Sequence, residues 1–419
     1  MTSRERVRAA LAHRTPDRTP IDLDSTPVSG IAAGTLAKLR AGLGLPSSPV
    51  RVHEPFQVLG MVEADARALL GVDTVPVRAP MTMFGFRNEG WKPWRLFDGT
   101  DVLVPGGFNY TTGADGDLYL YPGGDTSVPP SGHMPKGGYY FDAIVRQQPI
   151  DPDHLVPEEW AEGQFGVIPD EDLADMQRQS EDLYANTDLA LVHWFGGGGL
   201  GDIALVPGPG NKHPKGIRSP EEWYVAHMEY PEYIKGIFAL QTEVTMRNLE
   251  LLRQALGDRI EVLGLSGTDF GAQSGPFINP ATYREFFLPH HKRMIEWIHG
   301  NTNWKVLFHT CGSIAAFLDD LVEIGVDIVN PVQCSAAGME PETLKATWGD
   351  RMVFWGGAID TQRVLPFGTP DEVRAQTTER LRILGQNGGM VACAIHNIQQ
   401  NTPVDNILAF FETVRTTKM

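Results

Sequence analysis

The chain has three cysteines, and one of them lies two residues from a histidine at the end of an apolar run. The segment KVLFHTCGSI, residues 305–314, places His309 and Cys311 on the same side of an extended strand, because alternate side chains share a face. A thiolate and an imidazole together suit Zn²⁺. Free cysteine is also a common small core residue, so a buried structural pair is the alternative.

Other side chains capable of binding or catalysis lie in or just after apolar runs. They are Asp22, His193, Asp269, Cys334, Asp360, Cys393 and His396. Asp269 stands between glycines, where its carboxylate either approaches a ligand or caps a turn. His193 either faces a substrate or is a satisfied core histidine, and Asp22 either faces a substrate or organises the first loop.

The runs that carry these residues read as β-strands separated by helical segments, which is the pattern of repeated βα units. They are residues 19–23, 72–77, 189–195, 260–267, 304–309, 326–332, 352–359 and 390–395. Eight strands close a (β/α)₈ TIM barrel, whose catalytic groups lie at the carboxyl ends of the strands. All three cysteines fall on this expected active face.

Two additions to the barrel are expected. An N-terminal helical extension covers about residues 2–13, with Thr2 and Ser3 as cap candidates. After the second strand, about residues 80–170 lack the βα rhythm and contain hairpin patterns with glycine turns. We find no internal repeat, so residues 1–419 are predicted to form a single decorated domain.

Composition excludes several classes of function. The formal net charge of −17 argues against nucleic-acid binding, which needs clustered Lys and Arg. The charged N-terminus lacks the apolar core of a secretory signal, and no run is long enough for a membrane span. Three cysteines without paired spacing do not predict disulfides. A cytoplasmic enzyme with reduced thiols is therefore expected.

Several long motifs resemble the uroporphyrinogen decarboxylase-like superfamily. They are RERVRAALAHRTPDRTPIDL near the start, GTDFGAQSGPFINPATYREFFLPHHKRM in the middle, and FHTCGS, GVDIVNPVQ, GGAIDTQRVLPFGTPDEV and HNIQQNTPVDNI toward the end. The decarboxylases carry an arginine-rich motif near the N-terminus, where this chain has TPIDLDSTPVSG. The resemblance therefore points to the other branch, the corrinoid-dependent methyltransferases.

That branch implies a zinc site in which His309 and Cys311 match a His-x-Cys pair. Cys393 is the expected third ligand and His396 its rival, while Cys334 is a fourth ligand or a bystander. Asp269 or His396 is expected to assist by proton transfer. The substrate would meet His193, Asp22 and Asp360.

The implied activity is transfer of a methyl group between a small methylated compound, preferably an O-methyl compound, and a corrinoid (cobalamin). Because no D-x-H-x-x-G corrinoid motif occurs in the sequence, a separate corrinoid protein is the expected partner. The resemblance also implies a homodimer. The alternatives are a cofactor-independent decarboxylase and a non-catalytic ligand-binding barrel.

Overall fold

The computed structural model describes residues 1–202, 208–217 and 219–418. Its centre is a parallel sheet, for which seven strands are described in the order β15-β14-β13-β12-β11-β10-β3. These strands are β3 (Thr74–Val77), β10 (Ala190–Trp194), β11 (Val262–Ser266), β12 (Lys305–His309), β13 (Ile328–Asn330), β14 (Val353–Trp355) and β15 (Met390–Val391). Each lies within a run that the sequence predicts as a strand.

The first predicted strand, residues 19–23, closes the barrel through a single bridge rather than a ladder. Ile21 pairs in parallel with Ala392, beside β15, and its carbonyl accepts the backbone N–H of Asp73, beside β3, at 2.8 Å. Pro20 has no N–H to donate, and the chain turns away at Asp24, whose φ is +70°. The (β/α)₈ barrel expected from the sequence is therefore confirmed, with its first strand shortened.

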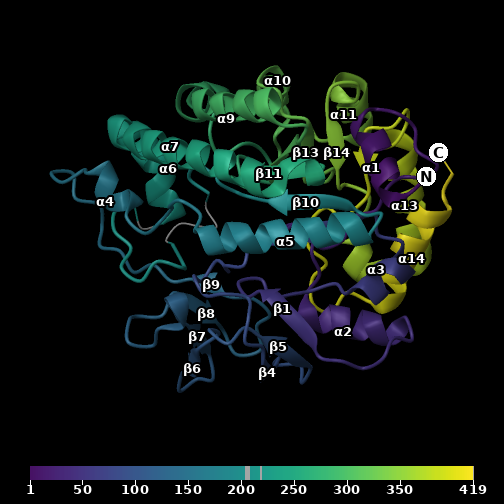
Figure 1. The fold of residues 1–419 in the computed structure, drawn as a ribbon, viewed down its shortest axis with the longest axis horizontal. Helices are drawn as coiled ribbons and strands as arrows, with labels where there is room; N and C mark the ends of the chain where they lie inside the picture. Colours follow the sequence, from purple (N-terminus) through teal and green to yellow (C-terminus); the bar gives the residue numbers. More distant parts are fainter. Residues whose placement is uncertain (203–207, 218, 419) are drawn as a thin grey trace.

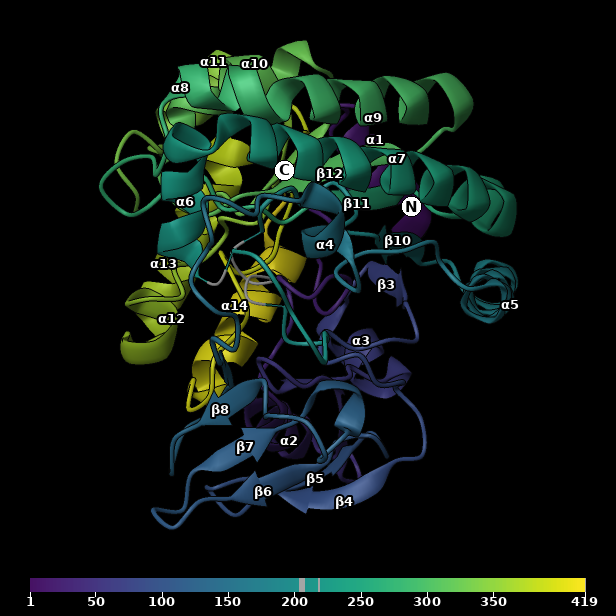
Figure 2. The ribbon, with the colours of Figure 1, turned by 90° about the vertical axis from the view of Figure 1, so that its left-hand side faces the viewer.

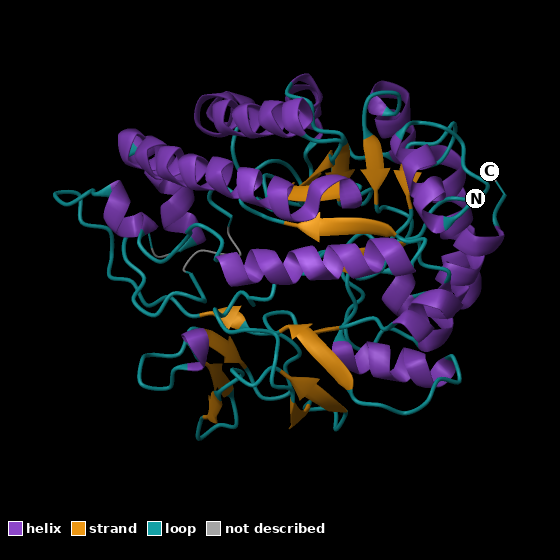
Figure 3. Ribbon diagram, viewed as in Figure 1, coloured by secondary structure: helices purple, strands orange, loops and turns teal. Residues whose placement is uncertain are grey.

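Helices form the outer layer, as Figure 3 shows in purple around the orange strands. Their bounds are α1 (Ser3–Leu11), α2 (Ala33–Gly42), α3 (Ala64–Leu70), α4 (Pro157–Ala161), α5 (Asp170–Asn186), α6 (Pro220–Glu229), α7 (Pro231–Leu256), α8 (Pro280–Thr282), α9 (Leu288–Asn301), α10 (Leu318–Glu323), α11 (Pro341–Trp348), α12 (Val364–Phe367), α13 (Pro370–Leu384) and α14 (Val404–Thr416). One π-helical turn, Tyr283–Phe287, joins α8 to α9. In the two ribbon views, α7 and α9 run side by side over one flank of the barrel (Figures 1 and 2).

The N-terminal helix α1 closes the amino end of the barrel. Thr2 caps it in a reciprocal capping box with Glu5, as one of the two predicted cap residues. Val7 and Leu11 of α1 belong to the same buried cluster as the inward-facing side chains of the strands, including Val192 and Leu307. The cavity described below is therefore at the other, carboxyl end, where barrel enzymes place their chemistry.

The predicted β-rich insertion forms two small sheets of four described strands each, at the bottom of Figures 1 and 2. One has the order β2-β1-β5-β4 and the other β6-β7-β8-β9. The strands are β1 (Val50–Glu54), β2 (Leu59–Gly60), β4 (Lys92–Arg95), β5 (Asp101–Val104), β6 (Tyr110–Thr112), β7 (Leu118–Leu120), β8 (Gly132–Met134) and β9 (Asp142–Ala143). Strands β1 and β2 precede β3, so this lobe also recruits the segment between the first two barrel strands. Among the described residues, no helix combines the length and the apolar character that a membrane crossing requires.

Candidate metal centre

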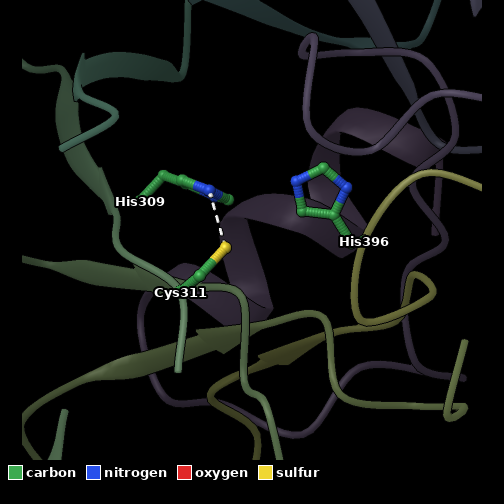
Figure 4. Close-up of side chains that lie close together, drawn as sticks. All are labelled: His309, Cys311 and His396. Atoms are coloured by element: carbon green, nitrogen blue, oxygen red, sulfur yellow. Dashed lines mark hydrogen bonds between the residues drawn. The ribbon is translucent and has the colours of Figure 1, made fainter. Parts of the chain in front are cut away.

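His309 and Cys311 lie at the carboxyl end of β12 and point toward His396, which comes from the loop after β15 (Figure 4). The Cys311 Sγ lies 3.4 Å from the His309 Nε2. One ligand atom from each of the three side chains lies within 4.8 Å of the others. A tetrahedral zinc site places a nitrogen and a sulfur ligand about 3.5 Å apart, from bonds of about 2.0–2.3 Å. The donor set and its spacing therefore fit Zn²⁺.

The orientation of the His309 ring is fixed from behind by Asn330 in β13. Its Nδ1 lies 2.6 Å from the Asn330 Oδ1, while the Asn330 Nδ2 donates to the carbonyl of Trp355 at 2.8 Å. Because that second bond sets the amide orientation, Oδ1 faces His309 as an acceptor, and His309 carries its proton on Nδ1. The Nε2 lone pair is then directed toward Cys311. Metal-bound histidines commonly donate their other ring N–H to an outer acceptor, the position that Asn330 has here.

The electrostatic surroundings favour a bound cation. Burial lowers the pKa of His309 to about 4, and burial with the neighbouring His309 lowers the pKa of His396 to about 4, so both rings are neutral ligands at neutral pH. Burial, then the negative charges of Asp269 and Asp202, raises the pKa of the Cys311 thiol well above its ordinary value. A divalent cation at this point would reverse that effect and hold the thiolate.

Asp269 and Gln333 hold the turn that carries Cys311. The Asp269 Oδ1 accepts the backbone N–H of Cys311 at 2.7 Å and lies 3.8 Å from the His309 Nε2. The Gln333 Oε1 accepts the N–H of Gly312 at 2.8 Å. Burial raises the pKa of Asp269, against the lowering effect of the Cys311 N–H. Asp269 is thus a poised carboxyl group beside the three-residue donor set.

A cavity of about 800 Å³ connects this donor set with the β-rich lobe. His309, His396 and Asp269 line one part of it, together with Trp194. The opposite wall comes from the loop after the first strand and from the inserted sheets, including Phe56. The volume is in the range of small-molecule sites in proteins.

The other two cysteines lie apart from the donor set. Cys393 is 2% exposed and packs in the barrel core with Val391 and Trp355. Cys334 donates from Sγ to the carbonyl of Val332 at 3.4 Å and packs against the outer core. The donor group found among the described residues thus contains His396 in the place expected for Cys393, and neither Cys393 nor Cys334 belongs to it.

The three residues expected to meet the substrate have structural contacts, and none lines the cavity as described. His193 lies on the outward face of β10, where its Nδ1 is 2.9 Å from the Val77 carbonyl. Asp22 accepts from the Trp355 Nε1 at 2.8 Å and from the Thr74 hydroxyl at 2.7 Å. The Asp360 Oδ1 accepts the backbone N–H groups that follow it, at 2.6 and 2.8 Å.

Sequence reasoning missed Asn330 and the opposite wall of the cavity. Asn330 directly follows the apolar core of the sixth strand, and the same rule that selected the other candidates could have selected it. The opposite wall includes Ser25, His53, Glu54 and Asn88. These four residues carry no motif, because strand β1 and two separate loops bring them together only in the fold.

Comparisons with known proteins show similarity to one protein family and to methyltransferases. The family model described as Uroporphyrinogen decarboxylase (URO-D) matches residues 213–417. A methylated-thiol–coenzyme M methyltransferase of Methanosarcina mazei is 27% identical over 149 residues, which cover 34% of this chain and 35% of that protein. The chain therefore matches only about a third of that relative's length. A solved methyltransferase structure from Methanosarcina mazei superimposes with a TM-score of 0.56 at 15% identity, over 99% of this chain and 98% of that one, and shows the fold.

Proposed function

We propose that this chain, whose residues 213–417 match the uroporphyrinogen decarboxylase family model, is a zinc-dependent methyltransferase that acts with a separate corrinoid protein. The observation that carries the proposal is the convergence of His309, Cys311 and His396, of which both histidines line the cavity. The partial likeness to a methyltransferase that acts on a methylated thiol supports the reaction class. In this reaction the methyl group passes from a small methylated substrate to the corrinoid.

The three donors would hold Zn²⁺, which supplies a Lewis acid for the oxygen or sulfur that loses the methyl group. An O-methyl compound is the preferred substrate, and the relative's thiol chemistry makes an S-methyl compound the second choice. Asn330 keeps the His309 Nε2 directed at the site, and Asp269 with Gln333 keeps the Cys311 turn in place.

Asp269 is the proposed proton donor of the reaction. In methyl transfer to the corrinoid, the bond from the methyl carbon to the substrate oxygen would break and both of its electrons would stay on the oxygen. That oxygen then needs a proton, and the buried Asp269 carboxyl, with its raised pKa, is a suitable source beside the donor set. His396, the other candidate for this role, is instead assigned to the metal.

A decarboxylase of a polycarboxylated substrate fits the cavity less well. Arg78 is the single Lys or Arg among the described lining residues, and Asp24 already pairs with it at 2.5 Å. Several carboxylates in one substrate would therefore lack cations to bind them. A non-catalytic barrel would have no need for the oriented His309.

The test uses zinc-loaded protein, free Co(I) cobalamin and a panel of methoxylated and methylthio compounds. The proposal predicts conversion to methylcobalamin, seen in the visible spectrum, that is lost in Cys311→Ser and retained in Cys334→Ser. Cys334→Ser is the matched control, since it removes a thiol outside the donor set. Carbon dioxide release without cobalamin, or full activity of metal-free protein, would contradict the proposal.

A further inference from the structure

The wall of the cavity that β1 contributes contains a buried carboxylate for which the described residues supply no cationic partner. Glu54 ends β1, is 7% exposed, and lines the cavity. Its two oxygens accept the backbone N–H groups of Phe56 and Gln57, at 2.9 and 2.8 Å. In the described part of the chain it forms no ion pair, and burial raises its pKa to about 7. A buried charge of this kind is costly unless a ligand compensates it.

Two further acceptor atoms lie on the same wall. Ser25 is 1% exposed and lines the cavity, and its Oγ lacks a hydrogen-bond partner among the described residues. The Asn88 Oδ1 also lacks one there, while its Nδ2 donates to the carbonyl of His53 at 2.9 Å. That bond leaves Oδ1 as the free end of the amide. Both oxygens have almost no exposed surface, so a ligand in the cavity would meet them after rotation of the Ser25 and Asn88 side chains.

His53 joins the segments that carry these groups. It directly precedes Glu54, its carbonyl binds Asn88, and its Nε2 lies 2.9 Å from the Oδ1 of Asp24, which directly precedes Ser25. The two acceptors and the carboxylate therefore belong to one connected patch. We call Ser25, Glu54 and Asn88 the acceptor wall.

The charge of the whole cavity has the same sign as this wall. Besides the proposed proton donor Asp269, three acidic residues line it, namely Glu54, Asp142 and Asp202. The lining guanidinium of Arg78 is 2.5 Å from a buried Asp24 oxygen and 3.0 Å from the His53 Nδ1. This arginine is already satisfied, so the surroundings favour cations over anions.

We propose that the acceptor wall binds an ammonium group at the end of the substrate opposite its methyl group. The substrate class is then a methyl ether or thioether that carries a positive charge, with its apolar middle against Phe56, Met83 and Trp194. An ammonium group has only hydrogen-bond donors, which match three acceptors. This inference rests on the proposed function for the position of the methyl group, but the binding preference itself does not depend on turnover.

The test measures the affinity of zinc-loaded protein, without corrinoid, for 3-methoxybenzylamine, 3-methoxybenzyl alcohol and 3-methoxybenzoate by calorimetry. The amine is expected to bind roughly 10- to 100-fold more tightly than the alcohol, because a hydrogen bond to a charged group is stronger by about this factor. The benzoate is expected to bind most weakly of the three. Benzoate binding that equals or exceeds amine binding would overturn the inference, whatever the variants do.

Variants then locate the preference. Glu54→Gln should reduce amine binding to about the level of the alcohol, with unchanged zinc content, and Ser25→Ala should weaken amine binding several-fold. Glu63→Gln is the matched control, because Glu63 pairs with Arg51 and does not line the cavity. An amine preference that survives Glu54→Gln would also overturn the inference. If methyl transfer fails with every compound while the amine preference persists, the proposed function is wrong and the acceptor wall stands.

Discussion

The Nδ1 of His309 and the Oδ1 of Asn330 lie 2.6 Å apart, in a bond between neighbouring barrel strands that determines which ring nitrogen is free. Removal of the acceptor by Asn330→Ala should weaken zinc binding about 10- to 100-fold, the usual effect of losing the outer partner of a metal-bound histidine. Competition with a chromophoric chelator measures this. Asn330→Asp keeps an acceptor and should bind zinc more tightly than Asn330→Ala, and equal affinities of the two variants would contradict the role.

Substitutions of Cys311 and of Cys334 distinguish the proposed zinc ligand from a cysteine outside the donor set. Cys311→Ser should weaken zinc binding by more than about 100-fold, because loss of a direct ligand exceeds loss of an outer partner. In the Co(II)-substituted protein, Cys311→Ser should also remove the charge-transfer band that a thiolate ligand gives. Cys334→Ser should change neither, since its thiol donates to the Val332 carbonyl and lies outside the donor set. A Co(II) spectrum unchanged in Cys311→Ser would rule out this cysteine as a ligand.

The third ligand is decided by comparing His396→Ala with Cys393→Ala. His396→Ala should lose most of the bound zinc while the fold remains, because this ring lies in a loop beside the cavity. Cys393→Ala should keep zinc and lower the free energy of unfolding by about 1–2 kcal/mol, as expected for a small void in the barrel core. Metal analysis after dialysis and urea denaturation measure the two effects. The opposite pattern would restore Cys393 as the ligand.

The raised pKa of Glu54 predicts that the free energy of unfolding depends on pH. Its pKa rises from an ordinary 4.5 to about 7 on folding, so the folded state favours the protonated form. The contribution of this preference to the free energy of unfolding is fully present below pH 4.5 and is lost as the pH rises through about 7. The free energy of unfolding changes by about 3 kcal/mol over this range. Relative to Glu54→Gln, the wild-type protein should therefore lose stability between pH 5 and pH 7.5. Urea denaturation of both proteins at each pH measures the difference, and parallel curves would contradict the assignment.

The barrel could be predicted from the sequence because each of its strands is a short, continuous apolar run between helical segments. The parallel strands of such a barrel are buried on both faces, so their composition alone marks them. The first strand was also predicted, although the sequence did not indicate that Pro20 and the turn at Asp24 reduce it to one bridge. The β-rich lobe was predicted only after the second strand, because β1, with the sequence VRVHE, has three polar residues among its five and β2 has two residues.

Only part of the candidate site could be predicted from the sequence. Spacing on a strand tells which side a residue faces, which was enough for His309 and Cys311. It does not tell at which height along the barrel axis a side chain lies. Cys393 faces inward but lies in the packed core, whereas His396, three residues later, reaches the cavity. Substrate contact by His193 and Asp360 stays a prediction. In the structure His193 lies beside the Val77 carbonyl and Asp360 caps the turn that follows it, contacts that the strand pattern does not show.

The central claim is that His309, Cys311 and His396 together hold zinc. Extended X-ray absorption fine structure of the zinc-loaded wild-type protein tests this claim most directly. It should show a single sulfur ligand at about 2.3 Å and at least two nitrogen ligands at about 2.0–2.1 Å. Two sulfur ligands, or a shell of oxygen and nitrogen without sulfur, would contradict the claim.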